Sequence, residues 1–176
     1  GRSGKLHLPD AADPQIGSGY IVLAMGKMGA FELNYSSDID LIVLFDPAIA
    51  PLQNNVEPGA LFVRITRGLV KLLQHRTEDG YVFRVDLRLR PDPSSTQIAI
   101  STPAALDYYE TRGQNWERQA MIKARVCAGD IAAGETLLGD LSPFVWRKYL
   151  DFAAVADVHA MKRQIHAYKG HGDIVV

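Results

Sequence analysis

The run Ile39–Phe45 most constrains what this chain folds into, because it is almost wholly apolar and rich in β-branched and aromatic side chains. Such side chains suit a packed, pleated surface, so the run predicts a buried strand that begins at about Ser37. Two acids, Asp38 and Asp40, stand at its entrance. Alternate residues of a strand share a face, so these carboxylates lie on one face, about 6–7 Å apart along the strand.

Two like charges at the edge of an apolar strand are costly unless a cation lies between them. Carboxylate oxygens are ligands of Mg²⁺ or Mn²⁺, which makes Asp38 and Asp40 candidate metal ligands. The alternative is a solvated strand end with two chance acids, and an Asp-x-Asp pattern taken alone favours that alternative.

The residues upstream shift the balance. Tyr20–Met25 predicts a short buried strand, and Gly26–Gly29 predicts a turn after it. Backbone N–H groups exposed by glycine, together with Lys27, make an anion site, although Gly-x-x-Gly is also compatible with an ordinary tight turn. A strand, a glycine turn and a strand bearing Asp-hydrophobic-Asp resemble the core of the nucleotidyltransferase superfamily that includes DNA polymerase β. The resemblance implies an α/β (α+β) fold, with a small mixed sheet flanked by helices and followed by a helical segment.

The stretch Tyr81–Arg90 alternates between apolar and charged residues, which predicts a strand with one buried face. If this strand lies beside the first acidic strand, Asp86 supplies a third carboxylate, and Arg88 and Arg90 reach toward phosphate. Three carboxylates on two neighbouring strands suit two-metal phosphoryl or nucleotidyl transfer. The alternative is a charged outer face with an ion pair or two.

Helical periodicity predicts further helices after these strands. We expect them over 61–75, from Thr102 to Thr111, over 115–126, and in segments at 131–138, 143–150 and 153–168. Trp116 either packs or stacks on a base, and Lys123 and Arg125 either reach phosphate or are solvated. The expected organisation is a flexible lead-in over 1–19, a catalytic core over 20–127 and a helical extension, cut short at its end, over 128–176.

Composition restricts the class of protein. The formal net charge is −1, so bulk attraction to nucleic acid or to an anionic membrane is not expected. Cys127 is the one cysteine among 176 residues, which excludes a disulfide framework or a cysteine zinc cluster. No apolar run reaches the length needed to span a bilayer, and we expect a cytoplasmic protein.

Three segments in register carry a closer resemblance: Ala24–Ile42, Arg84–Pro91 and Trp116–Arg125. They are similar to the motifs of the bacterial bifunctional glutamine synthetase adenylyltransferase/adenylyl-removing enzymes. In this family one half removes AMP from a tyrosine of glutamine synthetase by phosphorolysis, giving ADP, and the other attaches AMP from ATP, giving pyrophosphate. Pro143–Phe152, followed by Met161 and Lys162, resembles the N-terminal, removing half, of which we expect this chain to be a fragment.

The resemblance also implies roles for single residues. Asp38, Asp40 and Asp86 would be catalytic and would bind Mg²⁺ or Mn²⁺. Contacts to phosphate or nucleotide would come from Gly26, Lys27, Ser37, Arg88 and Arg90. The implied partners are glutamine synthetase, an adenine nucleotide and inorganic phosphate, with a PII signalling protein reached through the full-length enzyme.

Two other readings stay open. The chain is either the removing half or the adenylylating half, which differ in their products. It is otherwise a degenerate nucleotidyltransferase that serves as a regulatory binding module, although the presence of all three acids argues against degeneration. A nucleic-acid polymerase is disfavoured, because no basic stripe with interleaved aromatic residues is visible.

Overall fold

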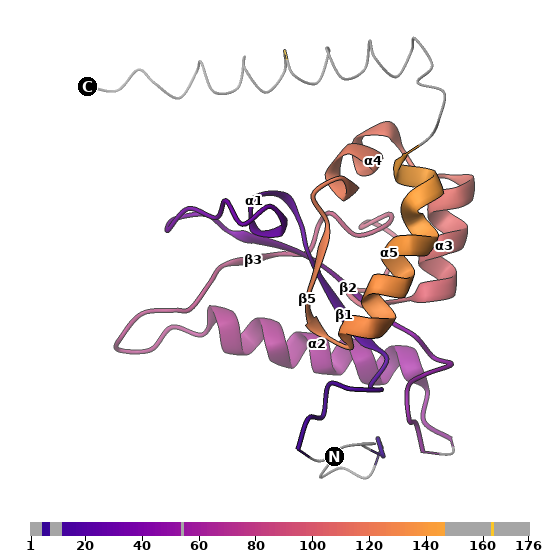
Figure 1. The fold of residues 1–176 in the computed structure, drawn as a ribbon. Helices are drawn as coiled ribbons and strands as arrows, with labels where there is room; N and C mark the ends of the chain where they lie inside the picture. Colours follow the sequence, from indigo (N-terminus) through magenta and orange to yellow (C-terminus); the bar gives the residue numbers. More distant parts are fainter. Residues whose placement is uncertain (1–4, 8–11, 54, 147–162, 164–176) are drawn as a thin grey trace.

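The computed structural model describes residues 5–7, 12–53, 55–146 and 163. Within them, a small mixed sheet of five strands packs against helices (Figure 1), which confirms the predicted α/β (α+β) class. The elements in chain order are β1 (Tyr20–Ala24), α1 (Gly26–Gly29), β2 (Ile39–Phe45), α2 (Pro58–Gln74), β3 (Val85–Asp86), β4 (Ile100–Ser101), α3 (Thr102–Thr111), α4 (Asn115–Met121), β5 (Arg125–Gly129) and α5 (Ile131–Val145).

The sheet is built around β2. Its strands run in the order β3-β2-β1-β5, and β4 pairs with the far end of β2. β1 is antiparallel to both β2 and β5, whereas β3 and β4 are parallel to β2. β2 is therefore covered along both edges, and its apolar residues are buried as the sequence predicted.

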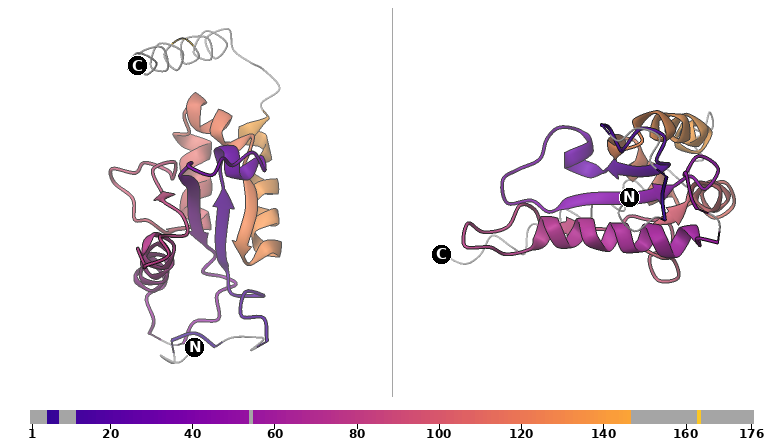
Figure 2. Two further views of the ribbon diagram at one scale, coloured as in Figure 1. Left: turned by 90° about the vertical axis from the view of Figure 1, so that its left-hand side faces the viewer. Right: turned by 90° about the horizontal axis from the view of Figure 1, so that it is seen from below.

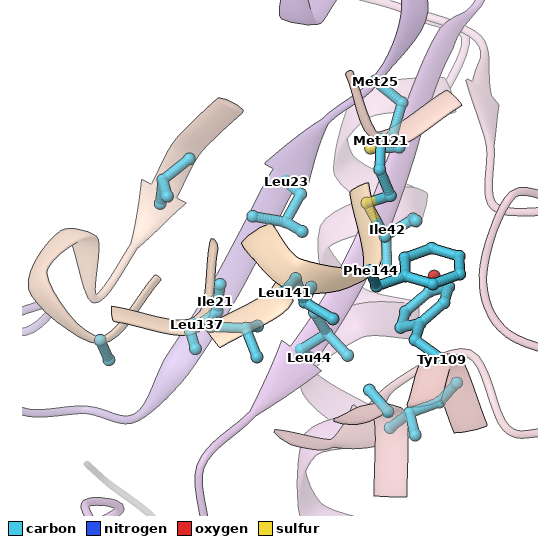
Figure 3. Packing of buried hydrophobic residues seen from close by; sticks show 14 residues of the cluster. Ile21, Leu23, Met25, Ile42, Leu44, Tyr109, Met121, Leu137, Leu141 and Phe144 are labelled. Carbon is cyan, nitrogen blue, oxygen red and sulfur yellow. The ribbon is translucent and has the colours of Figure 1, made fainter. Parts of the chain in front are cut away.

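The two faces of the sheet bury different side chains, because residues of a strand alternate between faces. One face packs against α3, α4 and α5 (Figure 3). The other packs against α2, and Figure 2 shows the sheet lying between α2 and α5. The hydrophobic cluster on the face that packs against α3, α4 and α5 includes the residues labelled in Figure 3: Ile21, Leu23, Met25, Ile42, Leu44, Tyr109, Met121, Leu137, Leu141 and Phe144.

Four predicted elements are confirmed within a few residues. The strands expected over Tyr20–Met25 and from about Ser37 are β1 and β2. The helices expected over 61–75 and from Thr102 to Thr111 are α2 and α3. The predicted turn at Gly26 is instead the short helix α1.

The prediction of one strand over Tyr81–Arg90 is wrong, because β3 comprises two residues. Before β3, the N–H groups of Val82 and Phe83 donate to the carbonyl oxygen of Leu73, at 3.1 and 3.0 Å, instead of to a strand. After β3, the Arg88 N–H donates to the Asp86 carboxylate at 2.8 Å, which turns the chain away from the ladder. Local bonds on both sides thus replace the longer pairing.

The prediction of one helix over 115–126 is also wrong. Helix α4 ends at Met121, and the chain then forms β5, which pairs with the free edge of β1. Gly129, with φ +83°, lies against the Tyr20 carbonyl, where an added Cβ would come within 2.0 Å of its oxygen. Pairing with a distant strand thus overrides the local helical pattern.

The segments expected at 131–138 and 143–150 are in part a single helix, α5, which continues through Pro143 to Val145. Helix α5 packs on β1 and β5, and its buried residues belong to the same hydrophobic cluster as those of the sheet. The expected boundary between a catalytic core and a helical extension at 127/128 stays a prediction. Most of the segment at 153–168 lies outside the described residues, as do Leu150, Phe152, Met161 and Lys162. Among the helices described, none has the length and apolarity to cross a membrane.

Candidate active site

β2 and β3 bring two carboxylates side by side. The parallel pairing of these strands sets Asp40 opposite Asp86. Paired strands lie about 4.8 Å apart and residues in register share a face, so both side chains leave the sheet in the same direction. The two acidic strands are therefore neighbours, which is the condition on which a third carboxylate depended, even though β3 is short.

The environment of Asp40 disfavours its charge. Asp40 is half-buried. Burial raises the pKa of its carboxyl above the usual value, and the negative charges of Asp86 and Asp38 raise it further, while the Arg88 guanidinium partly opposes them. Three carboxylates thus act on one another at this end of the sheet, which is the electrostatic situation that a cation relieves.

Asp86 is held by the arginine two residues after it. The Arg88 side chain and backbone N–H groups donate to both carboxylate oxygens, with Nε at 3.0 and 2.9 Å. These hydrogen bonds lower the pKa of Asp86, in the direction opposite to the shift at Asp40. The Asp86 side chain is 16% exposed and that of Arg88 is 84% exposed, so the acid is fixed in the fold and the arginine reaches into solvent.

Asp38 is paired with Arg84. The Arg84 Nε donates to the Asp38 carboxylate, and its Nη2 donates to the Ser36 carbonyl oxygen at 2.7 Å. Arg84 was not among the site residues expected from the sequence. The available signal for Arg84 in the sequence was its position on the same alternating face as Asp86 and Arg88. Arg84 precedes β3 and Arg88 follows it, and each neutralises a neighbouring acid.

The donor set suits a hard divalent cation in chemistry, because carboxylate oxygens are what Mg²⁺ and Mn²⁺ prefer. Over the ranges that the structure describes, no group of three His, Cys, Asp or Glu side chains is arranged to hold an ion. In the present arrangement, arginines occupy oxygens of Asp38 and Asp86. If Asp40 and Asp86 held a cation, Arg88 would have to release Asp86, and the 84% exposure of its side chain would leave it room to do so.

The N-terminal end of helix α1 lies next to Asp40. The Met25 N–H donates to the Asp40 carbonyl oxygen at 2.9 Å. Gly26 has φ +52°, and a Cβ added to it would lie 3.3 Å from Asp40 Oδ2. A glycine thus meets both requirements here, the left-handed backbone and the close carboxylate. The N–H groups of a first helical turn, here those of Gly26, Lys27 and Met28, have no partner within the helix, and Gly26 lies next to the Asp40 carboxylate.

The remaining expected residues lie at different places. Lys27 is exposed on α1, next to Gly26. Ser37 is half-buried, and its N–H donates to the Asn34 carbonyl oxygen at 3.0 Å in the loop before β2. Arg90 turns away from the acids: its Nη atoms donate to the carbonyl oxygens of Leu87 and Pro93, both at 2.8 Å. Arg90 thus holds the loop after β3, and the roles expected for these three side chains stay predictions.

Comparisons with known proteins point to one family. The model of the family described as "Glutamate-ammonia ligase adenylyltransferase" matches residues 4–139. Relatives named "Bifunctional glutamine synthetase adenylyltransferase/adenylyl-removing enzyme" are 66% identical in Bradyrhizobium sp. (strain BTAi1) and 63% identical in Mesorhizobium japonicum, each over 98% of this chain. The relative of that name in Xanthobacter autotrophicus is 65% identical over 99% of the chain. The chain spans 18% of the length of each of these three relatives.

Proposed function

Because the chain belongs to the glutamate-ammonia ligase adenylyltransferase family, we propose that it forms a metal-dependent nucleotidyltransferase domain that acts on adenylylated glutamine synthetase. In the proposed reaction, inorganic phosphate attacks the phosphorus of the AMP group, and the bond to the tyrosine oxygen breaks. The products are ADP and the free tyrosine. The observation that carries the proposal is the register of Asp40 with Asp86 beside Gly26.

The three acids are proposed to hold Mg²⁺ or Mn²⁺, with Asp40 and Asp86 as the nearest pair. The metal, when bound, neutralises charge on the phosphates and on the leaving oxygen. The raised pKa of Asp40 supports this assignment, because the fold keeps that carboxylate short of positive charge. Metal stabilisation of the leaving phenolate also means that no strong protein acid is required.

Arg88 and Arg84 are proposed to exchange partners in the cycle. Each now neutralises one carboxylate from an exposed position. With a cation held by the acids, the guanidinium groups of Arg84 and Arg88 would be available for phosphate oxygens, which their planar fork suits. Gly26 and Lys27 contribute N–H groups and a positive charge on the other side of Asp40, so anionic phosphate is met from α1 and from β3.

Acids that hold a cation beside phosphate contacts would suit either AMP-transfer reaction, so a second candidate is the adenylylating half, which takes AMP from ATP and releases pyrophosphate. The names of the relatives contain both activities, and the chain spans 18% of their length. We favour removal because Pro143–Phe152 resembles that half, although of this motif only Pro143–Trp146 are described. Glutamine synthetase as the partner, PII regulation and a cytoplasmic location belong to the same proposal.

Product identity tests the proposal. The protein, together with whatever residues flank the chain in its natural sequence, is mixed with adenylylated glutamine synthetase, phosphate and Mg²⁺. Phosphate-dependent ADP formation is the expected result. Pyrophosphate release from ATP with unmodified synthetase would instead assign the adenylylating half. Nucleotide binding without metal dependence, and with neither product, would overturn an enzymatic role in favour of a regulatory binding module.

A further inference from the structure

Arg125 makes three contacts with the segment that follows β1, although it lies on β5. Its Nε donates to the Gly29 carbonyl oxygen at 3.2 Å, and its Nη2 donates to the Met28 carbonyl oxygen at 3.1 Å. Its guanidinium carbon lies 3.9 Å from the centre of the Phe31 ring. The carbonyl oxygens at the end of a helix lack partners within it. Arg125 binds two of them in α1, and the Met28 carbonyl oxygen also accepts the Phe31 N–H at 3.3 Å.

The rest of the β5 entrance fits the same surface of α1. A Cβ added to Gly29 would lie 1.9 Å from the Lys123 carbonyl oxygen, so the two backbones are in direct contact. The Lys123 ammonium pairs with Glu32 at 2.9 Å. Phe31 has φ +59°, a conformation that costs a non-glycine residue energy. The Arg125 guanidinium, stacked on that ring, stabilises it in place.

We propose that Arg125 is a positioning residue that holds α1, and with it Gly26 and Lys27, against Asp40. The chain of contacts is short: Arg125 binds the carbonyl end of α1, and the opposite end of this four-residue helix lies against the Asp40 carboxylate. The consequence for phosphate binding rests on the proposed function, whereas the clamp on α1 does not.

The clamp requires arginine and not merely positive charge. Two carbonyl oxygens and a ring face are engaged at once, which the planar guanidinium with its several N–H groups can do. A lysine ammonium carries the same charge but cannot bind both carbonyls in that geometry while stacking on Phe31. Arg125→Lys therefore separates positioning from charge, and Arg125→Gln removes both.

A purely structural role predicts a different pattern from a positioning role. Loss of global stability reduces the amount of folded protein, so it lowers the maximal rate and leaves the KM for phosphate unchanged. Loosening of α1 alone changes the site in every folded molecule. It therefore raises the KM for phosphate and speeds amide exchange in α1, while exchange in β1 and β2 stays as it was.

The test uses Arg125→Lys and Arg125→Gln, with Arg64→Gln on the exposed side of α2 as the matched control. Hydrogen exchange is followed at the amides of Gly29 and Ala30, which now donate to Met25 and Gly26 at 3.0 and 3.2 Å. We expect exchange there to be about tenfold faster in both Arg125 variants and unchanged in the control. Unchanged exchange at these amides would overturn the clamp.

The same variants are assayed for ADP formation at varied phosphate. The expected result is a KM for phosphate raised about tenfold in both Arg125 variants, with Arg64→Gln as native. A native KM in Arg125→Lys would show that charge suffices and would refute positioning. If the native protein forms no ADP, the proposed function fails, and the exchange measurement still decides whether Arg125 holds α1.

Discussion

Replacing Asp86 by asparagine tests the proposed site most directly. The substitution keeps the shape of the side chain and removes one of the two charges that lie in register on β2 and β3. Amide oxygen is a poorer ligand for a divalent cation than carboxylate, and the negative charge that attracts the ion falls by one unit. We expect turnover to fall by at least about a thousandfold, which is about 4 kcal/mol of transition-state stabilisation.

The fold should tolerate this change. The ion pair that Asp86 loses is with an 84% exposed arginine, and pairs of this kind contribute little to stability. The charge repulsion with Asp40 is lost as well, which offsets the missing hydrogen bonds. We therefore expect a melting temperature within about 4 °C of the native value.

The assay is phosphate-dependent ADP formation from adenylylated glutamine synthetase, with thermal unfolding measured on the same samples. Asp140→Asn, at an exposed position of α5, is the matched control and should behave as native in both measurements. Native turnover in Asp86→Asn would refute the assignment of this carboxylate to the site. A collapse of the melting temperature would show instead that Asp86 is needed for folding.

Two further predictions concern stability. The pKa of Asp40 is raised in the folded protein, so its ionised carboxylate destabilises the fold. Asp40→Asn should therefore have a higher melting temperature than the native protein at pH 7, and this difference should vanish as the pH falls through the raised pKa toward about 4. The same variant should lose ADP formation. A lower melting temperature at pH 7 would contradict this sign. Gly29→Ala should destabilise by more than about 2 kcal/mol, because its Cβ would meet backbone oxygens of Lys123 and Ala24, whereas Gly68→Ala, with open space around it in α2, should be neutral or stabilising by up to about 1 kcal/mol. Denaturant unfolding of the pair measures both values, and equal effects would refute the packing argument.

The sequence was sufficient for the elements whose burial is uniform. Apart from Asp40, β1 and β2 consist of apolar and aromatic residues that bury side chains on both faces, and such runs are recognisable without knowledge of their neighbours. Helix α2 has one apolar stripe and a proline in its first turn, both of which are local signals. The acids at the start of β2 were also recognisable from the sequence, because charged residues are unexpected next to a buried strand.

β5 could not be predicted in the same way. Arg125–Gly129 becomes a strand because β1 presents a free edge to it, and that edge belongs to residues about a hundred positions earlier. The helical spacing that runs on past Met121 carries no sign of this partner. The contacts of Arg125 with α1 depend on the same long-range pairing, so neither of the two alternatives weighed for this side chain, phosphate or solvent, describes them.

β3 shows a third case, in which the alternation was interpreted correctly as far as Arg88 and the extent of the strand was not. Arg84, Asp86 and Arg88 do emerge on the charged side, and Phe83, Val85 and Leu87 pack against the core. The ladder is short because side chains compete with it: Asp86 accepts the Arg88 N–H, and Arg90 binds carbonyl oxygens of the loop. An alternating pattern fixes which way side chains point, but hydrogen-bond competition decides how far a strand extends.

The charged groups of this site form one balanced arrangement. Arg84 binds Asp38 and Arg88 binds Asp86, while Asp40, beside both acids, has a raised pKa. The cost of gathering three carboxylates is thus offset in part by the arginines that flank β3 and left in part at Asp40. Because this residual cost is removed by either a proton or a cation, the fold itself favours the binding of positive charge at Asp40. If a cation displaced the two arginines as proposed, their guanidinium groups would be available for an anion, so we expect metal and phosphate to bind cooperatively at this end of the sheet.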